Sequence, residues 1–336
     1  MSRKPSPYPD GPDEADLWFL PGPVEDDDAP PLPRAEVEGG VVAGWSRAEA
    51  ANARALARLA QRFGALDDRL ARGPAGWRQR LALMEAAELG WLAGDRIGAD
   101  RLALWLALRL GGVQADAQAL GRVAWAVRRL TGGPGPEAGL AAFLGRQEAG
   151  GEEGLADRAG GWAGAMAQAG ALHPFTRAAL GFHLWSLAGL DRGPGAQLEA
   201  AVTAARIAAA EGAGAVFLPL GLGGGGGLRA AGDPEARLRR WYAGAEAATL
   251  AALRQIEAVE GWRARAGAAA SGLSGRTPPL LLDALADWPL LSAPMAGEIT
   301  GASRAAVQRN LAWFEARGLI REVTGQGRYR FWAALV

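Results

Sequence analysis

The sequence of 336 residues contains no cysteine and only two histidines, His173 and His183. The missing cysteines exclude disulfide bonds, thiolate metal sites and cysteine nucleophiles, and they suit a cytoplasmic protein. On one helix the two histidines would lie about 80° out of alignment, and neither has a carboxylate at metal-ligand spacing. The serines lack a matching histidine and acid. We therefore expect no catalytic residue, no metal and no cofactor.

Long apolar runs are also missing. The best candidate, Leu102–Leu108, is closed by Arg109 and is far shorter than the roughly 20 residues that span a bilayer. The first residues are acidic and proline-rich and lack the apolar core of a signal peptide. We therefore expect no membrane partner.

Lysine is almost absent, since Lys4 is the only one and every other side-chain cation of this kind is an arginine. With the abundance of alanine and glycine, this bias indicates a GC-rich genome, so arginine content alone is no evidence for nucleic-acid binding. The net charge is zero, but its distribution is uneven. Residues 1–40 contain ten acidic groups and three basic ones, whereas six arginines and two glutamates follow Ala302. Only the positions of the arginines can indicate a nucleic-acid partner.

Composition and periodicity divide the chain into four parts. Residues 1–40 predict a flexible arm, because prolines and acids cannot repay the entropy of ordering. Residues 41–270 show apolar residues at helical spacing between glycine-rich breaks and predict an all-α domain of uncertain role. Residues 271–276 are interpreted as a linker, and residues 277–336 as a second domain. The expected body helices are one capped by Ser46, then Trp77–Leu89, Ala99–Leu110, Ala115–Leu130, Glu137–Gln147, Leu155–Gln168, Pro174–Leu190, Ala196–Ala210 and Pro234–Arg265.

Two segments outside these helices invite interpretation. The arm contains Leu17–Leu20, Leu-Trp-Phe-Leu, which is apolar enough to dock on the protein's own surface. The run Gly223–Gly227 is interpreted as a flexible connector, because a phosphate-binding loop would need a lysine and a hydroxyl after its glycines, and Leu228 and Arg229 follow instead.

The last sixty residues show an ordered series of local signals. Leu280–Leu285 predicts a short apolar helix, and Ser292 predicts the cap of a second helix that ends at Thr300. Gly301 and Ala302 form the tight turn that joins two helices of a helix-turn-helix. Ser303 then caps a third helix, which ends with Gly318 in the usual position after the last turn.

The third helix separates an apolar stripe from a polar face. Val307, Leu311 and Phe314 recur at i, i+4 and i+7 and are expected to point inward. The opposite face holds Arg304, Ala305, Gln308, Arg309 and Ala312. Arginine can donate two hydrogen bonds to a guanine edge and glutamine can bind adenine, while small alanines allow close approach. We expect Arg304, Gln308 and Arg309 to contact DNA bases.

Two alternating segments, 319–323 and 328–332, surround Thr324–Gly327 and predict a β-hairpin. The expected phosphate contacts are Ser303, Arg321, Arg328 and Arg330. The predicted fold class is therefore mainly α, with a helical body followed by a winged helix-turn-helix. The predicted function is binding of double-stranded DNA as a transcriptional regulator, with a homodimer as a further expectation because a two-fold site would double the contacts. Winged helices also serve as protein-interaction modules, so a scaffold is an alternative.

The segment Leu291–Trp332 resembles a helix-turn-helix domain found in a family of alphaproteobacterial, often plasmid-borne, proteins. Members of that family end in a motif like Glu322–Trp332, with the sequence EVTGQGRYRFW, and Ala65–Arg72 resembles an early segment of the family. The resemblance covers most of the chain beyond residue 45, more closely in the tail than in the body. It implies a helical domain of unknown function followed by a DNA-binding module.

The body is more distantly similar to a degenerate Fic (adenylyl-transferase) domain. The similarity rests on Met84–Leu89, where that family has an inhibitory glutamate, on His173–Phe175, and on Val216–Leu220. It implies an ancestral nucleotide site, but Arg177 and an apolar helix stand where the family has a metal-binding acid and a phosphate-binding turn. A Fic-derived enzyme is thus an alternative whose active site is expected to be lost.

The acidic arm has two other interpretations besides solvated disorder. It could dock within the same molecule on the basic face of the C-terminal domain and compete with DNA, because both the arm and DNA are anionic. It could also contact another protein.

Overall fold

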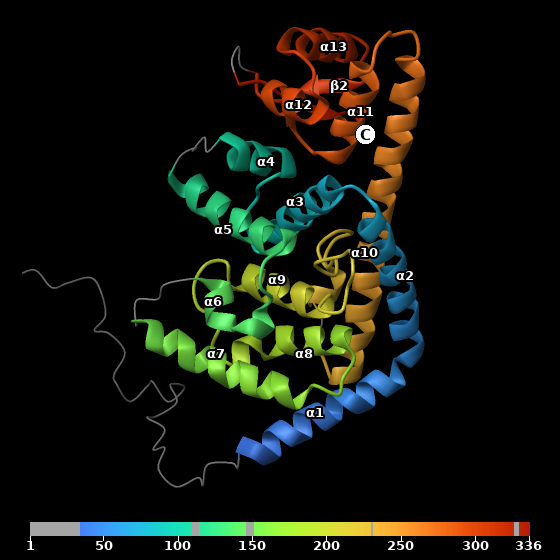
Figure 1. Cartoon of the computed structure of the whole chain (residues 1–336). Helices are drawn as coiled ribbons and strands as arrows, with labels where there is room; N and C mark the ends of the chain where they lie inside the picture. The colour runs from blue at the N-terminus through green and yellow to red at the C-terminus, as the bar shows by residue number, and fades with distance from the viewer. Residues whose placement is uncertain (1–33, 109–113, 146–150, 230, 326–328) are drawn as a thin grey trace, which may run out of the picture.

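The computed structural model describes residues 34–108, 114–145, 151–229, 231–325 and 329–336, and these residues are mainly helical with one small sheet near the C-terminus (Figure 1). The body contains α1 (Arg34–Ala51), α2 (Ala53–Arg72), α3 (Ala75–Leu92), α4 (Ala99–Leu108), α5 (Gln114–Thr131), η2 (Pro136–Ala138), α6 (Leu140–Leu144), α7 (Gly151–Gln168), α8 (Pro174–Leu187), α9 (Ala196–Ala208), η3 (Gly226–Arg229) and α10 (Pro234–Ala269). The C-terminal region contains α11 (Thr277–Asp287), β1 (Leu291–Ser292), α12 (Ala293–Thr300), α13 (Arg304–Ala316), β2 (Ile320–Glu322) and β3 (Phe331–Ala334). No helix in these ranges is long and apolar enough to cross a membrane.

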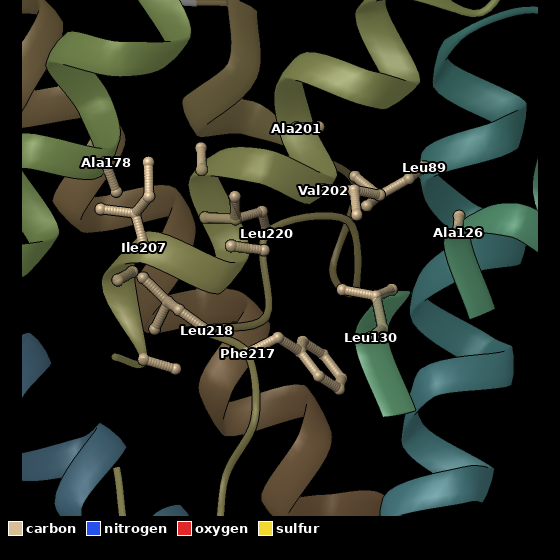
Figure 2. Packing of buried hydrophobic residues seen from close by; sticks show 14 of the residues in the cluster. Leu89, Ala126, Leu130, Ala178, Ala201, Val202, Ile207, Phe217, Leu218 and Leu220 are labelled. Atoms are coloured by element: carbon tan, nitrogen blue, oxygen red, sulfur yellow. The ribbon is translucent and has the colours of Figure 1, made fainter. Parts of the chain in front are cut away.

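Helix α9 lies at the centre of the body. Its residues are apolar on nearly all sides, and a helix of this kind has to be covered all round. Helices α8, α3 and α5 provide the cover. Figure 2 shows side chains of this core: Ala201, Val202 and Ile207 from α9, Leu89 from α3, Ala126 and Leu130 from α5, Ala178 from α8, and Phe217, Leu218 and Leu220 from the loop that follows α9.

Two carboxylates hold the loop after α9. Asp67 of α2 accepts hydrogen bonds from the backbone N–H groups of residues 213–215 at 2.7–3.1 Å. The buried Glu85 of α3 accepts three more from residues 220–222 at 2.7–3.0 Å. Burial opposes ionisation of Asp67, but its three donors outweigh that effect and lower its pKa. For Glu85 burial is the larger effect, and the pKa is raised. The loop is therefore a fixed part of the body.

The glycine run 223–227 is packed at two of its five positions, which corrects its interpretation as a flexible connector. Gly225 and Gly227 are buried, and a Cβ atom on Gly244 of α10 would lie only 2.3 Å from the amide nitrogen of Gly227. Gly225 and Gly227 lie close to the side chain of Leu92 and the backbone of α10, which leaves little space for a side chain at these two positions, whereas Gly224 and Gly226 face open space.

Helix α10 joins the body to the C-terminal region. It has 36 residues, or about 54 Å at 1.5 Å per residue, and runs along the molecule in Figure 1. Trp241 and Tyr242 lie in the body core, whereas Trp262 and Ala266 lie in the core of the C-terminal region. Residues 271–276, which the sequence predicts to be a linker, form the turn between α10 and α11, two helices that pack together.

The small sheet has the strand order β1-β3-β2, with both pairs antiparallel. Ile320 pairs with Ala334, and Glu322 pairs with Trp332. Because side chains alternate along a strand, Ile320 and Trp332 enter the C-terminal core while Val323, Phe331 and Ala333 pack against the body core. We call the side of the sheet formed by Val323, Phe331 and Ala333 its body-facing side. The body thus covers one side of the sheet and the helices of the C-terminal region cover the other.

Several predicted boundaries require correction. Helix α1 begins at Arg34, so helical structure starts inside the predicted arm of residues 1–40; residues 1–33, with Leu17–Leu20, lie outside the described residues. Ser46 lies within α1 and caps no helix, because the break comes at Asn52, whose side chain donates to the carbonyls of Ala48 and Glu235. The local capping signal of Ser46 is overridden by this tertiary contact.

Two short elements also differ from the predictions. The helix expected at Glu137–Gln147 is replaced in the described residues by the 3-10 turn η2 and the short α6, because Gly139 and Gly145 adopt positive φ at the ends of α6. Strand β1 has two residues, too few for an alternating pattern, and was not predicted. Strand β3 begins at Phe331, three residues later than predicted, so Arg330 precedes the strand.

Candidate nucleic-acid interface

The turn between α12 and α13 is fixed by short polar side chains. The hydroxyl of Ser292 accepts a hydrogen bond from the N–H of Met295 and caps α12. Gly301 ends α12 with φ +64°, a conformation that glycine adopts without strain. Thr300 donates its hydroxyl to the carbonyl of Ala296 at 2.6 Å and accepts from the N–H of Ala302 at 3.3 Å. Three residues therefore separate the two helices in a defined geometry.

Helix α13 has the two faces that its sequence predicts. Val307, Leu311 and Phe314 are 0% exposed. The opposite surface, which we call the arginine face, consists of Arg304, Ala305, Gln308, Arg309 and Ala312, all exposed. In the described part of the chain, Arg304, Gln308 and Arg309 have neither a hydrogen bond nor an ion pair through their side chains. Three polar groups at i, i+4 and i+5 thus point outward beside small alanines.

Ser303, predicted to contact phosphate, caps α13. Its hydroxyl oxygen accepts from the N–H of Ala306 at 3.3 Å. The residue is exposed at the N-terminus of α13, where the helix dipole favours an anion.

Arg330 is attached to the end of α13. Its guanidinium lies 3.3 Å from the carboxylate of Glu315 and 5.0 Å from the centre of the Trp332 ring. The indole N–H of Trp332 also donates to Glu315 at 3.3 Å. Arg330 therefore orders the hairpin against α13 and remains about two-fifths exposed. Arg328, the next predicted phosphate contact, lies outside the described residues.

Arg321 is in a different environment from the arginine face. Its guanidinium forms an ion pair with Asp100 in the first turn of α4. Arg321 directly follows Ile320 on β2, and the side chain of Ile320 enters the C-terminal core. Because neighbouring side chains on a strand point to opposite sides, Arg321 lies on the body-facing side of the sheet with Ala333. The structure brings Arg304, Gln308 and Arg309 together but does not bring Arg321 to them.

Two features of the hairpin are not predicted from the sequence. Glu322 accepts from the N–H groups of Thr324 and Gly325 at 2.8 and 2.9 Å and from the Thr324 hydroxyl. Slight burial opposes ionisation, but these donors outweigh it and lower the pKa of Glu322. An acid two residues before Thr-Gly is a usable turn signal. Tyr329 is 77% exposed and has φ +58°, which is unusual for a residue other than glycine. No sequence pattern predicts this backbone conformation.

Two of the residues on which the Fic resemblance was judged, His173 and Arg177, make contacts that stabilise the fold. His173 caps α8, its Nδ1 accepting from the N–H of Phe175 at 3.2 Å, and burial lowers its pKa. Arg177 forms an ion pair with Glu137 at 2.6 Å. In the described residues no three histidine, aspartate or glutamate side chains gather as a metal site would require.

Comparison of the sequence with protein-family models gives no match, and comparison with curated proteins gives none either. The functional assignment therefore depends on the geometry of α12, α13 and the sheet.

Proposed function

We propose that residues 277–336 form a winged helix-turn-helix and that the protein binds double-stranded DNA through α13 as a transcriptional regulator. The order helix, strand, helix, helix, strand, strand supports this proposal, as does the sheet order β1-β3-β2. The short glycine-containing turn from α12 to α13 is typical of a helix-turn-helix. In this arrangement α13 is the recognition helix and the segment between β2 and β3 is the wing.

The main support is the exposed and unpaired arginine face. Arg304 and Arg309 have neither an acidic partner nor a ring to stack on in the described part of the chain, so both guanidinium groups on this helix face are available to a ligand. Each has donors for a guanine edge or a phosphate, and Gln308 between them can bind adenine.

The body leaves this face uncovered. It contacts the C-terminal region through α10, α3 and the body-facing side of the sheet, and the arginine face stays exposed. A scaffold that used the face within its own chain would bury it. A scaffold that binds another protein through the face is an outcome that the experiment below distinguishes.

We further propose that the body is non-catalytic and that it supports a homodimer. The cation Arg177, tied to Glu137, occupies the position at which the Fic resemblance would place a metal-binding acid. A dimer would present two copies of α13 to a two-fold site and compensate for the limited affinity of a single winged helix.

The test is a selection from random double-stranded oligonucleotides with the full chain, followed by anisotropy measurements on the enriched sequence. The Arg304→Ala/Arg309→Ala variant is expected to lose at least 25-fold in affinity, because each bidentate base contact contributes about 1–3 kcal/mol. The affinity should also fall with salt concentration.

A matched control is Arg54→Ala/Arg62→Ala, which removes the same charge from two exposed positions on α2. This variant should select the wild-type sequence with nearly unchanged affinity. If wild type enriches no sequence, or if both variants behave alike, α13 is not a DNA-recognition helix. Retention of one protein partner by wild type and its loss in the first variant would favour the scaffold.

A further inference from the structure

An apolar groove lies at the end of the body formed by α1, α7 and α8. Its volume is about 760 Å³, within the range of ligand and peptide sites. The lining includes Val41 and Val42 of α1, Trp162 and Ala165 of α7, and Leu184 and Leu187 of α8. Apolar atoms predominate in its wall.

The groove contains apolar surface that nothing in the described residues covers. Leu187 is 82% exposed, the highest value among the large hydrophobic residues that the structure describes. On the facing helix α7, Cβ atoms added to Gly161 and Gly164 would meet no heavy atom within 4 Å. The groove is therefore open along α7 and has an uncovered leucine on α8, as expected of a surface that receives a partner segment.

We propose that the apolar segment Leu17–Leu20 of the same chain occupies this groove. The chain outside the described residues at this end is 33 residues long and joins α1 at Arg34. From there Val41 and Val42 are only about two helical turns away, roughly 10 Å. The thirteen residues 21–33 could extend over about 43 Å, so they are long enough to fold back.

Because residues 21–33 connect Leu17–Leu20 to α1, even a weak contact would keep this segment in the groove. A segment held on a short linker has an effective concentration in the millimolar range, so an intrinsic dissociation constant of that order already fills the groove for half of the time. Leu17–Leu20 is the only run of four large apolar residues in the arm, and leucine, tryptophan and phenylalanine suit a groove lined by valine, leucine and tryptophan.

The location also distinguishes this site from the arginine face. Figure 1 shows the start of α1 at one end of the molecule and α13 at the other. An arm docked in the groove would keep its acidic residues near α1 and α7 and away from the DNA-binding surface. Groove docking and docking of the arm on the arginine face are therefore competing occupancies.

The absence of natural cysteines allows a direct test in the full chain. In the Phe19→Cys/Leu187→Cys variant, mild oxidation should form a disulfide within one molecule, seen as a mobility change of the monomer on a non-reducing gel. The rate should be at least tenfold higher than in Phe19→Cys/Ala312→Cys, in which the second cysteine lies on the arginine face. Adding Gly161→Leu/Gly164→Leu should fill the groove and reduce the fast rate to that of the control.

These leucines replace helical glycines and should favour folding of α7, so a loss of cross-linking would not reflect unfolding. Circular dichroism checks that the variant remains helical. Equal rates for the two cysteine pairs would overturn the proposal, as would a rate that Gly161→Leu/Gly164→Leu leaves unchanged. A third outcome would assign the groove to a second copy of the chain. In that case the Phe19→Cys/Leu187→Cys variant would give no intramolecular disulfide, and the single variant Leu187→Cys would form disulfide-linked dimers.

Discussion

The indole N–H of Trp262 donates a hydrogen bond to the carbonyl oxygen of Leu319 at 2.8 Å. Trp262 belongs to α10, which begins in the body core, and Leu319 directly precedes β2. The same carbonyl accepts the N–H of Leu335 at 3.1 Å. One side chain of the long helix is therefore hydrogen-bonded to the carbonyl at which the two ends of the β2–β3 hairpin meet.

A second connection joins α3 to the end of α11. The guanidinium of Arg80 donates to the carbonyls of Leu285, Ala286 and Trp288 at 2.9–3.3 Å. Carbonyls at a helix C-terminus lack partners within the helix, and a cation there also complements the helix dipole. Burial lowers the pKa of Arg80 to about 10, so the side chain stays charged at neutral pH. Through these contacts the body fixes the orientation of the C-terminal region.

Replacing Trp262 by phenylalanine should reduce the free energy of unfolding by about 1–2 kcal/mol. The change removes one hydrogen bond and part of a buried ring, while the N–H of Leu335 still satisfies the Leu319 carbonyl. Urea unfolding followed by circular dichroism measures the effect. The half-exposed Trp91 provides the control, since Trp91→Phe should change stability by less than about 0.5 kcal/mol. Equal effects of the two substitutions would mean that the hydrogen bond does not join the two regions.

Gly76→Ala should be strongly destabilising, by more than about 2 kcal/mol. A Cβ atom at this position in α3 would lie 2.1 Å from the carbonyl oxygen of Asp287 at the end of α11, so the two helices would have to separate. Thermal unfolding provides the measurement. Gly64→Ala in α2, where no heavy atom lies within 4 Å, should instead stabilise by up to about 1 kcal/mol. A neutral Gly76→Ala would show that α11 can shift on the body without cost.

The C-terminal helices were predictable because their signals are local. Ser292 and Ser303 cap as their sequence positions predict, and Val307, Leu311 and Phe314 form the buried stripe. Capping and helical periodicity are decided within a few residues, so neighbouring sequence contains the information.

The relation of the C-terminal region to the body was not predictable from such signals. Asp100 and Arg321 are 221 residues apart, and Trp262 and Leu319 are 57 apart. Nothing in the local sequence indicates that Arg321 faces an acid of α4, since an arginine in an alternating strand looks the same whichever surface it meets. Likewise, residues of the single helix α10 belong to both cores, and the linker-like residues after this helix give no sign of that arrangement.

His183 should make the protein less stable as the pH falls from about 6.5 to about 4. Burial among Trp45 and Phe182, with Arg237 as a neighbouring charge, lowers the pKa of His183 from 6.5 to about 4. The unfolded chain therefore binds a proton in this window before the folded chain does, so stability falls with falling pH. The difference is at most about 3 kcal/mol at 1.36 kcal/mol per pKa unit.

The measurement for His183 is urea unfolding of wild type and His183→Phe at several pH values. The difference between the two proteins isolates His183 from His173, whose pKa is also lowered. Wild type should lose stability relative to His183→Phe between pH 6.5 and 4 and show a constant difference above pH 7. Parallel curves throughout that window would mean that His183 titrates normally in the folded protein.

Arg321→Ala and Arg309→Ala should affect DNA binding very differently, although both remove one arginine from the C-terminal region. Arg309 lies on the arginine face, and its loss should weaken binding about 5- to 150-fold, the equivalent of 1–3 kcal/mol. Arg321 is paired with Asp100 and lies on the body-facing side of the sheet, so its loss should change affinity less than twofold and leave the salt dependence unaltered. Anisotropy titrations at several salt concentrations measure both quantities. Asp100→Asn is the companion variant, because it removes the negative charge that pairs with Arg321. If Arg321 can then reach a phosphate, Asp100→Asn will bind DNA more tightly and with a steeper salt dependence. That result would place Arg321 in the DNA interface and contradict the prediction.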